Sequence, residues 1–74
     1  MRLQILDVEQ KPINLGTSGN VGEIVDYTNK ITGEPDPRFV FEGNSIRWLH
    51  LSTLKENYSA MFVKDLDTEE IKEL

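Results

Sequence analysis

The fold is decided by the stretch Arg38-Phe-Val-Phe-Glu-Gly-Asn-Ser-Ile-Arg-Trp-Leu-His-Leu51. Phe39 and Phe41 alternate across one residue, and the run 46–51 alternates in the same way after the turn-forming cluster 42–45. A period of two on both sides of a glycine turn is typical of two antiparallel strands joined as a hairpin. The chain is therefore predicted to be chiefly a β protein.

Further strands are predicted where alternation coincides with β-branched and aromatic residues. In chain order they are 3–8, with a bulge or with both faces partly covered, a short edge strand 13–15, then 21–28 and 58–63. The segments between them have turn composition: a turn at 10–11, a loop over 16–20, a hairpin turn over 29–33 and an extended surface connection over 34–37, which holds two prolines.

Helical structure is expected only as short turns. Ser52 or Thr53 can cap a turn that Asn57 closes in a left-handed conformation, and a full helix is not expected there. Residues 65–74 hold five acidic residues and one lysine, which fits either a capped helical turn or a frayed, solvated end. We divide the chain into a single β domain over 1–66 and an acidic C-terminal tail or short helix over 67–74.

Together these elements predict an all-β fold of about five or six short antiparallel strands, as a small sandwich or a partly open barrel with a short helical turn. The alternative is an α+β fold with a C-terminal helix. The predicted core consists of Leu3, Ile5, Ile24, Tyr27, Phe39, Phe41, Trp48, Leu51, Tyr58 and Phe62.

Composition limits the function. The chain has 74 residues, no cysteine and thirteen acidic against eight basic side chains, a net charge of −5. Nucleic-acid binding is not expected, because no cluster of lysine and arginine could hold phosphates. No apolar run reaches the roughly 20 residues of a membrane helix, and the N-terminal run 1–7 meets a charge, at Asp7, too soon for a signal peptide. We expect a cytoplasmic or virion protein that is not secreted and has no transmembrane segment.

Few residues are candidates for chemistry. His50 is the only histidine and, sharing a face with Ile46 and Trp48, fits a half-buried structural role better than catalysis. One histidine without cysteine also lacks the usual ligands of zinc. The carboxylate pairs Asp65 with Asp67 and Glu34 with Asp36 lack the order of a calcium loop and fit a solvated turn better. We therefore predict no catalytic, cofactor-binding or metal-binding residue.

Exposed aromatic residues with arginine dominate protein interfaces. Trp48, Arg47 and Tyr58 are of these types. As the only tryptophan of a short domain, Trp48 is predicted to lie in the core rather than at an interface. Arg47 should face away from it, and both a core and an interface role stay open for that arginine.

Two segments resemble the immunoglobulin-like β-sandwich domains in tail and baseplate proteins of phages that infect Gram-positive bacteria. Leu3-Gln-Ile-Leu-Asp-Val-Glu-Gln-Lys-Pro-Ile-Asn-Leu15 is similar to their opening strand with its Asp-x-x-Gly-Lys-Pro turn, and Leu54-Lys-Glu-Asn-Tyr-Ser-Ala-Met-Phe-Val-Lys-Asp65 to the Leu-x-x-Gly-x-Tyr-x-Ala-x-Phe-x-Val strand near their end. Gln10 and Asn57 stand where that pattern has glycine. The resemblance implies a non-enzymatic virion or phage accessory protein.

The function expected from the sequence is protein–protein interaction, with itself or with other virion proteins, without cofactor, small-molecule substrate, nucleic acid or membrane. The alternative is an acidic monomeric regulator that binds and inhibits a host protein, because a negative surface can occupy a basic groove. A small hydrolase would need a nucleophile and a base that the sequence does not offer.

Overall fold

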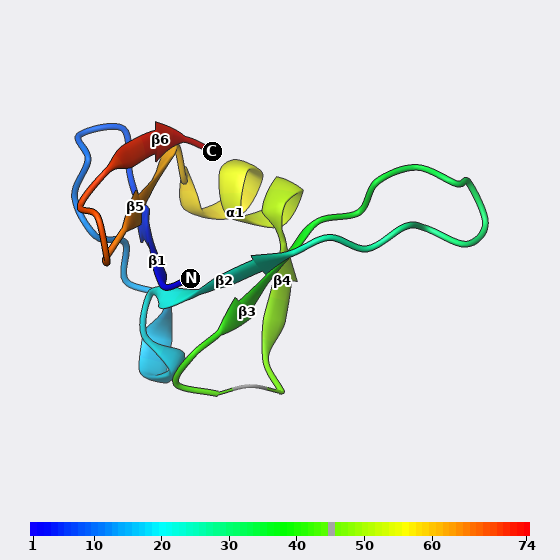
Figure 1. Ribbon diagram of the computed structural model, residues 1–74, viewed down its shortest axis with the longest axis horizontal. Coiled ribbons are helices and arrows are strands. Elements are labelled where there is room, and N and C mark those ends of the chain that lie inside the picture. Colours follow the sequence, from blue (N-terminus) through cyan, green and yellow to red (C-terminus); the bar gives the residue numbers. More distant parts are fainter. Residues whose placement is uncertain (45) are drawn as a thin grey trace.

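One open sheet of six antiparallel strands forms the body of the computed structural model, which describes residues 1–44 and 46–74 (Figure 1). The strands are β1 (Leu3–Leu6), β2 (Val21–Val25), β3 (Arg38–Phe41), β4 (Trp48–His50), β5 (Phe62–Asp65) and β6 (Ile71–Glu73). Their order across the sheet is β4-β3-β2-β1-β5-β6, a 3-10 turn covers Gly16–Ser18, and the one α-helix of the described residues is α1 (Leu51–Tyr58). The predicted all-β class with five or six strands and a short helical element is confirmed.

The hairpin that decided the fold pairs as expected. Val40 lies opposite Trp48 and Arg38 opposite His50, which puts these four side chains on one face of β3 and β4. Phe39 and Phe41 therefore point to the other face, where their rings meet edge to face with centroids 5.1 Å apart. Residue 45 of the predicted turn lies outside the described residues.

The core lies on that second face, between the bent sheet and α1. Leu3, Ile5, Phe39 and Phe41 are buried as predicted, and Ile24 and Leu51 are partly buried against them, whereas Phe62 is half-buried. Five buried hydrophobic residues were not predicted: Leu6, Leu15, Leu54, Ala60 and Val63. The prediction is wrong for Tyr27, Trp48 and Tyr58, which are exposed. Trp48 and, just beyond β2, Tyr27 lie on the face of β2–β4 that no other described element covers, whereas Tyr58 is the last residue of α1.

Between residues 51 and 65, the helix and the strand that follows it begin and end at other residues than predicted. α1 has two turns rather than one, and it starts after His50 without a side-chain cap from Ser52 or Thr53. Ser59, not Asn57, takes the left-handed conformation that ends it, at φ 56°. The apolar anchor is Leu54, which is fully buried, so packing stabilises a helix that is marginal by propensity.

The end of the chain is a strand, so the expected helix or frayed tail over 67–74 is wrong. β6 pairs with β5, the Leu74 amide donates to the Met61 carbonyl at 2.9 Å, and the Leu74 side chain packs against the core. The predicted edge strand over 13–15 is also absent from the described sheet. Near it, Pro12 forms only an isolated bridge with Leu6, since proline offers no amide for a ladder.

Two loops of the chain adopt the same type of turn, with the same side-chain hydrogen bonds. In residues 29–34 the Asn29 side chain accepts the amides at 31 and 32, and the Thr32 hydroxyl accepts the Glu34 amide. In residues 65–70 the Asp65 side chain accepts the amides at 67 and 68, and the Thr68 hydroxyl accepts the Glu70 amide. The spacing of Asn or Asp three residues before Thr is the signal that predicts both turns.

These two turns differ at their fifth residue, which leads to a prediction. Gly33 has φ 74° and Glu69 has φ 62°, a region that costs a residue with a Cβ roughly 1–2 kcal/mol. We expect Glu69→Gly to raise the free energy of unfolding by about 0.5–1 kcal/mol, because the greater freedom of glycine in the unfolded chain offsets part of the gain. Urea denaturation measures the change. Gly33→Glu is the matched reverse substitution and should destabilise, and a loss of stability in Glu69→Gly would contradict the argument.

Candidate functional site

The most prominent feature of the surface is a two-stranded arm, residues 26–37, which joins β2 to β3 and projects away from the body (Figure 1). Its two sides are held by the Asp36 amide, which donates to the Tyr27 carbonyl at 2.7 Å, and by a bridge between Thr28 and Pro35. The predicted hairpin turn forms its tip. There the Ile31 side chain is 95% exposed, next to Lys30.

A clamp of stacked side chains stands at the base of the arm. The guanidinium carbon of Arg38 lies 4.3 Å from the centroid of the Tyr27 ring and 4.0 Å from that of Trp48. Both distances are within the range of cation–π attraction. Tyr27 is still 45% exposed and Trp48 41% exposed, so the stack forms part of the outer surface.

Asp36 and His50 complete the clamp. The Nδ1 atom of His50 lies 2.8 Å from Oδ1 of Asp36, and Nη2 of Arg38 is 3.5 Å from Oδ2 of the same carboxylate. The His50 and Trp48 rings meet edge to face, with centroids 5.0 Å apart. The half-buried position of His50 beside Trp48 is as predicted. The clamp ties the arm to β3 and β4 and fixes its direction.

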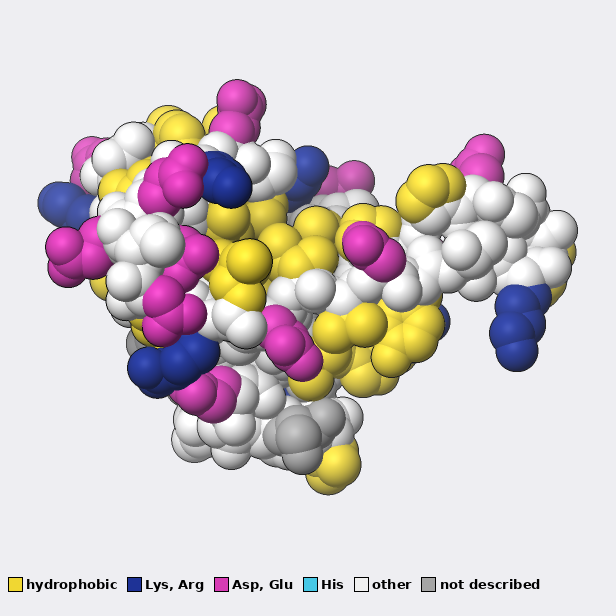
Figure 2. Space-filling model, viewed as in Figure 1, with side chains coloured by type: hydrophobic (Ala, Val, Ile, Leu, Met, Phe, Trp, Pro, Cys, Tyr) yellow, Lys and Arg dark blue, Asp and Glu magenta, His cyan; other side chains and the backbone are white. Residues whose placement is uncertain are grey.

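Strand parity explains why these side chains gather on one face. Val25 lies opposite Arg38, and Arg38 lies opposite His50, so alternate residues of β2, β3 and β4 share the face turned away from the core. We call it the outer face. Figure 2 shows hydrophobic side chains over this part of the sheet beside the base of the arm, with acidic side chains among them.

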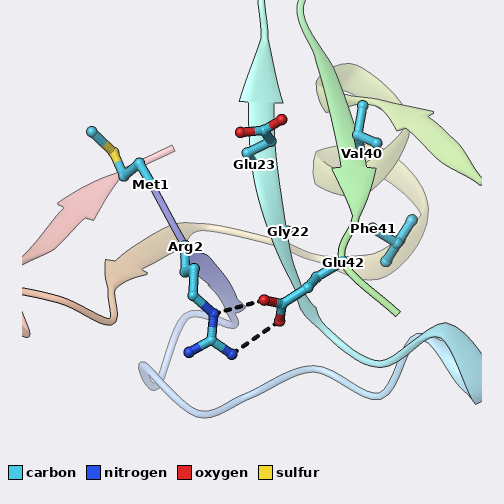
Figure 3. Close-up of a pocket in the computed structure, with 7 residues that line it drawn as sticks. All are labelled: Met1, Arg2, Gly22, Glu23, Val40, Phe41 and Glu42. Carbon is cyan, nitrogen blue, oxygen red and sulfur yellow. Dashed lines mark hydrogen bonds and ion pairs between the residues drawn. The ribbon is translucent and has the colours of Figure 1, made fainter. Parts of the chain in front are cut away.

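A trough of about 240 Å³ lies on the same face, close to the clamp. Its lining includes Met1, Glu23 and Val40, and the bidentate pair of Arg2 and Glu42 closes one side (Figure 3). Val40 connects the two features, because it lines the trough and lies opposite Trp48 in the sheet. Glu23 forms no ion pair with any of the described residues.

The Arg2–Glu42 pair gives a pH prediction. The hydrogen bond from Arg2, together with its charge, lowers the pKa of Glu42 from its ordinary value of 4.5, and the same bond raises the pKa of Arg2. Because the folded pKa of Glu42 is the lower one, the stabilisation is present above about pH 4.5 and is lost as the pH falls through the folded value. We expect an NMR titration of the Glu42 carboxyl to show a midpoint below 4.5.

In Arg2→Ala that midpoint should return to the ordinary range, whereas Lys11→Ala should leave it unchanged, since Lys11 pairs with Glu9 instead. An unchanged midpoint in Arg2→Ala would contradict this account of the pKa of Glu42.

Other residues singled out in the sequence lie elsewhere. Arg47 faces away from Trp48 as expected: its Nη1 donates to the Leu15 carbonyl at 2.8 Å and its guanidinium lies over the Phe41 ring. Asp65 caps its own turn, Tyr58 is exposed on α1, and of the pair Glu34 and Asp36 only Asp36 reaches the clamp. No group of three metal-ligating side chains forms within residues 1–44 and 46–74.

The sequence named Trp48 and His50 but missed Tyr27 and Arg38 as members of a common site. The alternation that assigned residues 21–28 and 38–41 to strands places Tyr27 and Arg38 on the same face once β2 is known to pair with β3, so this pattern could have indicated the site.

Comparison with protein-family models, curated proteins and solved structures finds no match. Within the described part of the chain, no helix has both the length and the apolar character to cross a membrane.

The residue types of the clamp can be compared with those of catalytic and of binding sites. His50 with Asp36 has the geometry of a base and its orienting carboxylate, but no hydroxyl group among the described residues hydrogen-bonds to the imidazole. Tyrosine, tryptophan and arginine, by contrast, are the residue types that most often carry binding energy between proteins.

Proposed function

We propose that this chain is a non-enzymatic protein–protein interaction module that binds its partner through the outer face and the arm. The observation that carries the proposal is the exposed stack of Tyr27, Arg38 and Trp48 at the base of the arm. A rigid aromatic surface of this kind binds a partner with little loss of side-chain entropy. The clamp provides this rigidity.

We further propose that it is a small phage or prophage virion or accessory protein. The support is the resemblance of its opening and closing segments to immunoglobulin-like phage domains. Gln10 stands where those domains have a turn glycine, and its φ of 62° is one that glycine adopts readily. Asn57, the second such position, lies within α1, so the resemblance does not extend to that turn.

A photocrosslinking experiment in the host cell tests the interaction. A photoreactive phenylalanine analogue at position 27 should give discrete crosslinked products, and the same analogue at Tyr58 is the control, since Tyr58 is also an exposed tyrosine but lies on α1. Adding Trp48→Ala to the position 27 chain should reduce the product at least tenfold, as removal of a binding hot spot does. No product from position 27, or equal yields from both positions, would overturn the proposal.

A further inference from the structure

We propose that two copies of this chain associate by exchanging arms, with the tip of each arm seated in the trough of the other copy. The inference rests on the proposed interaction function and names the partner as a second copy. It starts from the arm tip, where Ile31 offers a branched apolar side chain and Lys30 a positive charge outside any ion pair of the described residues.

The trough has the complementary chemistry. Its exposed apolar lining comes from Met1 and Val40, and Glu23 also lines it, with a carboxylate that pairs with no charged group of the described residues. The Arg2–Glu42 pair neutralises the other charges that line it. A dry apolar cavity of about 150 Å³ holds a benzene ring, so a trough of about 240 Å³ has room for an isoleucine side chain.

The dimensions fit a closed pair. Six residues on each side of the arm, at about 3.3 Å each, give a reach of about 20 Å from base to tip. The trough begins about 7 Å from the base, because Glu23 and Val40 are each two residues from the last paired positions of β2 and β3, Val25 and Arg38, and it extends from there toward Gly22 and Glu42. Two arms lying antiparallel side by side therefore bring each tip to the base of the other, a two-fold arrangement that makes both contacts at once.

The rigid clamp is what makes the exchange specific. Arg38 is held between Tyr27 and Trp48, and Asp36 is held by His50, so the arm leaves the body in one direction. A flexible loop of the same length would lose more conformational freedom on binding.

Charge reversal in trans tests this arrangement. Light scattering after size-exclusion chromatography should show a dimer of the wild-type chain that dissociates on dilution. Lys30→Glu places two carboxylates against each other in each contact, and Glu23→Lys places two ammonium groups there, so each variant alone should associate at least tenfold more weakly. An equimolar mixture should recover the wild-type association, because both contacts then join opposite charges.

Ile31→Asp should be monomeric at every concentration. Lys55→Glu, an equal change of charge on α1, is the control and should dimerise as the wild type does. A wild-type chain that is monomeric throughout, or a mixture that fails to recover, would overturn arm exchange. A monomer that still crosslinks from position 27 to another protein overturns arm exchange alone, whereas the absence of any crosslink overturns the proposed function as well.

Discussion

Phe39→Ala should remove a large share of the stability of the fold, because this ring is fully buried in the core. Phe39 is 0% exposed and packs edge to face against Phe41. Truncating a buried phenylalanine costs about 3–5 kcal/mol. A chain of 74 residues has roughly 4–11 kcal/mol of stability in total, so the variant should lose between about a quarter of it and all of it. Urea denaturation followed by far-ultraviolet circular dichroism gives the difference.

Trp48→Ala is the informative comparison, since both aromatic residues were predicted to lie in the core. Trp48 is on the outer face and loses mainly its contacts with Arg38 and His50, so we expect a cost of about 1 kcal/mol. Val8→Ala, at an exposed site, should change stability by less than about 0.5 kcal/mol. Equal losses in Phe39→Ala and Trp48→Ala would mean that the two faces of the hairpin are wrongly assigned.

Gly22→Ala should destabilise the sheet by about 2–3 kcal/mol, because a single added methyl group has no room there. A Cβ at Gly22 would overlap the carbonyl group of Val40, with the carbonyl carbon at 2.9 Å and the Phe39 ring at 3.0 Å. Backbone cannot move aside as a flexible side chain can, so β2 and β3 would have to separate. Thermal unfolding of the variant measures the loss.

Glu23→Ala is the matched control for this glycine. It changes the next residue of β2, which is exposed, and at protein concentrations where both chains are monomeric it should leave stability within about 0.5 kcal/mol of the wild type. A Gly22→Ala chain as stable as Glu23→Ala would show that β2 and β3 are not so closely packed at this point.

The arm and the clamp depend on each other. Without the clamp, a hairpin of twelve residues outside the body would be marginal, because an isolated two-stranded hairpin is at best marginally stable in water. With it, Tyr27 and Asp36 tie both sides of the arm to Arg38 and His50. The exposed aromatic surface is therefore part of what holds the arm in place, and both belong to one site.

Local patterns predicted the parts of the fold that depend on local chemistry. The alternation around Phe39 and Phe41 identified the hairpin and its buried face, and the turn composition of 29–33 located the arm tip. The same reasoning failed for Tyr58 and for the tail. α1 and β6 form because Leu54 and Leu74 find room in the core, and no local propensity indicates that.

For the site, the sequence by itself determined the residue types and which of them share a face of their strand, namely Arg38 with Val40 and Trp48 with His50. It also indicated an extended segment between β2 and β3. It did not determine which face of the hairpin is covered, because both faces carry large side chains and size alone favours burial of Trp48. Only the tertiary structure decided this. The helix and the remaining strands pack on the side of Phe39 and Phe41, and so leave Tyr27, Arg38 and Trp48 to stack on one another in contact with solvent.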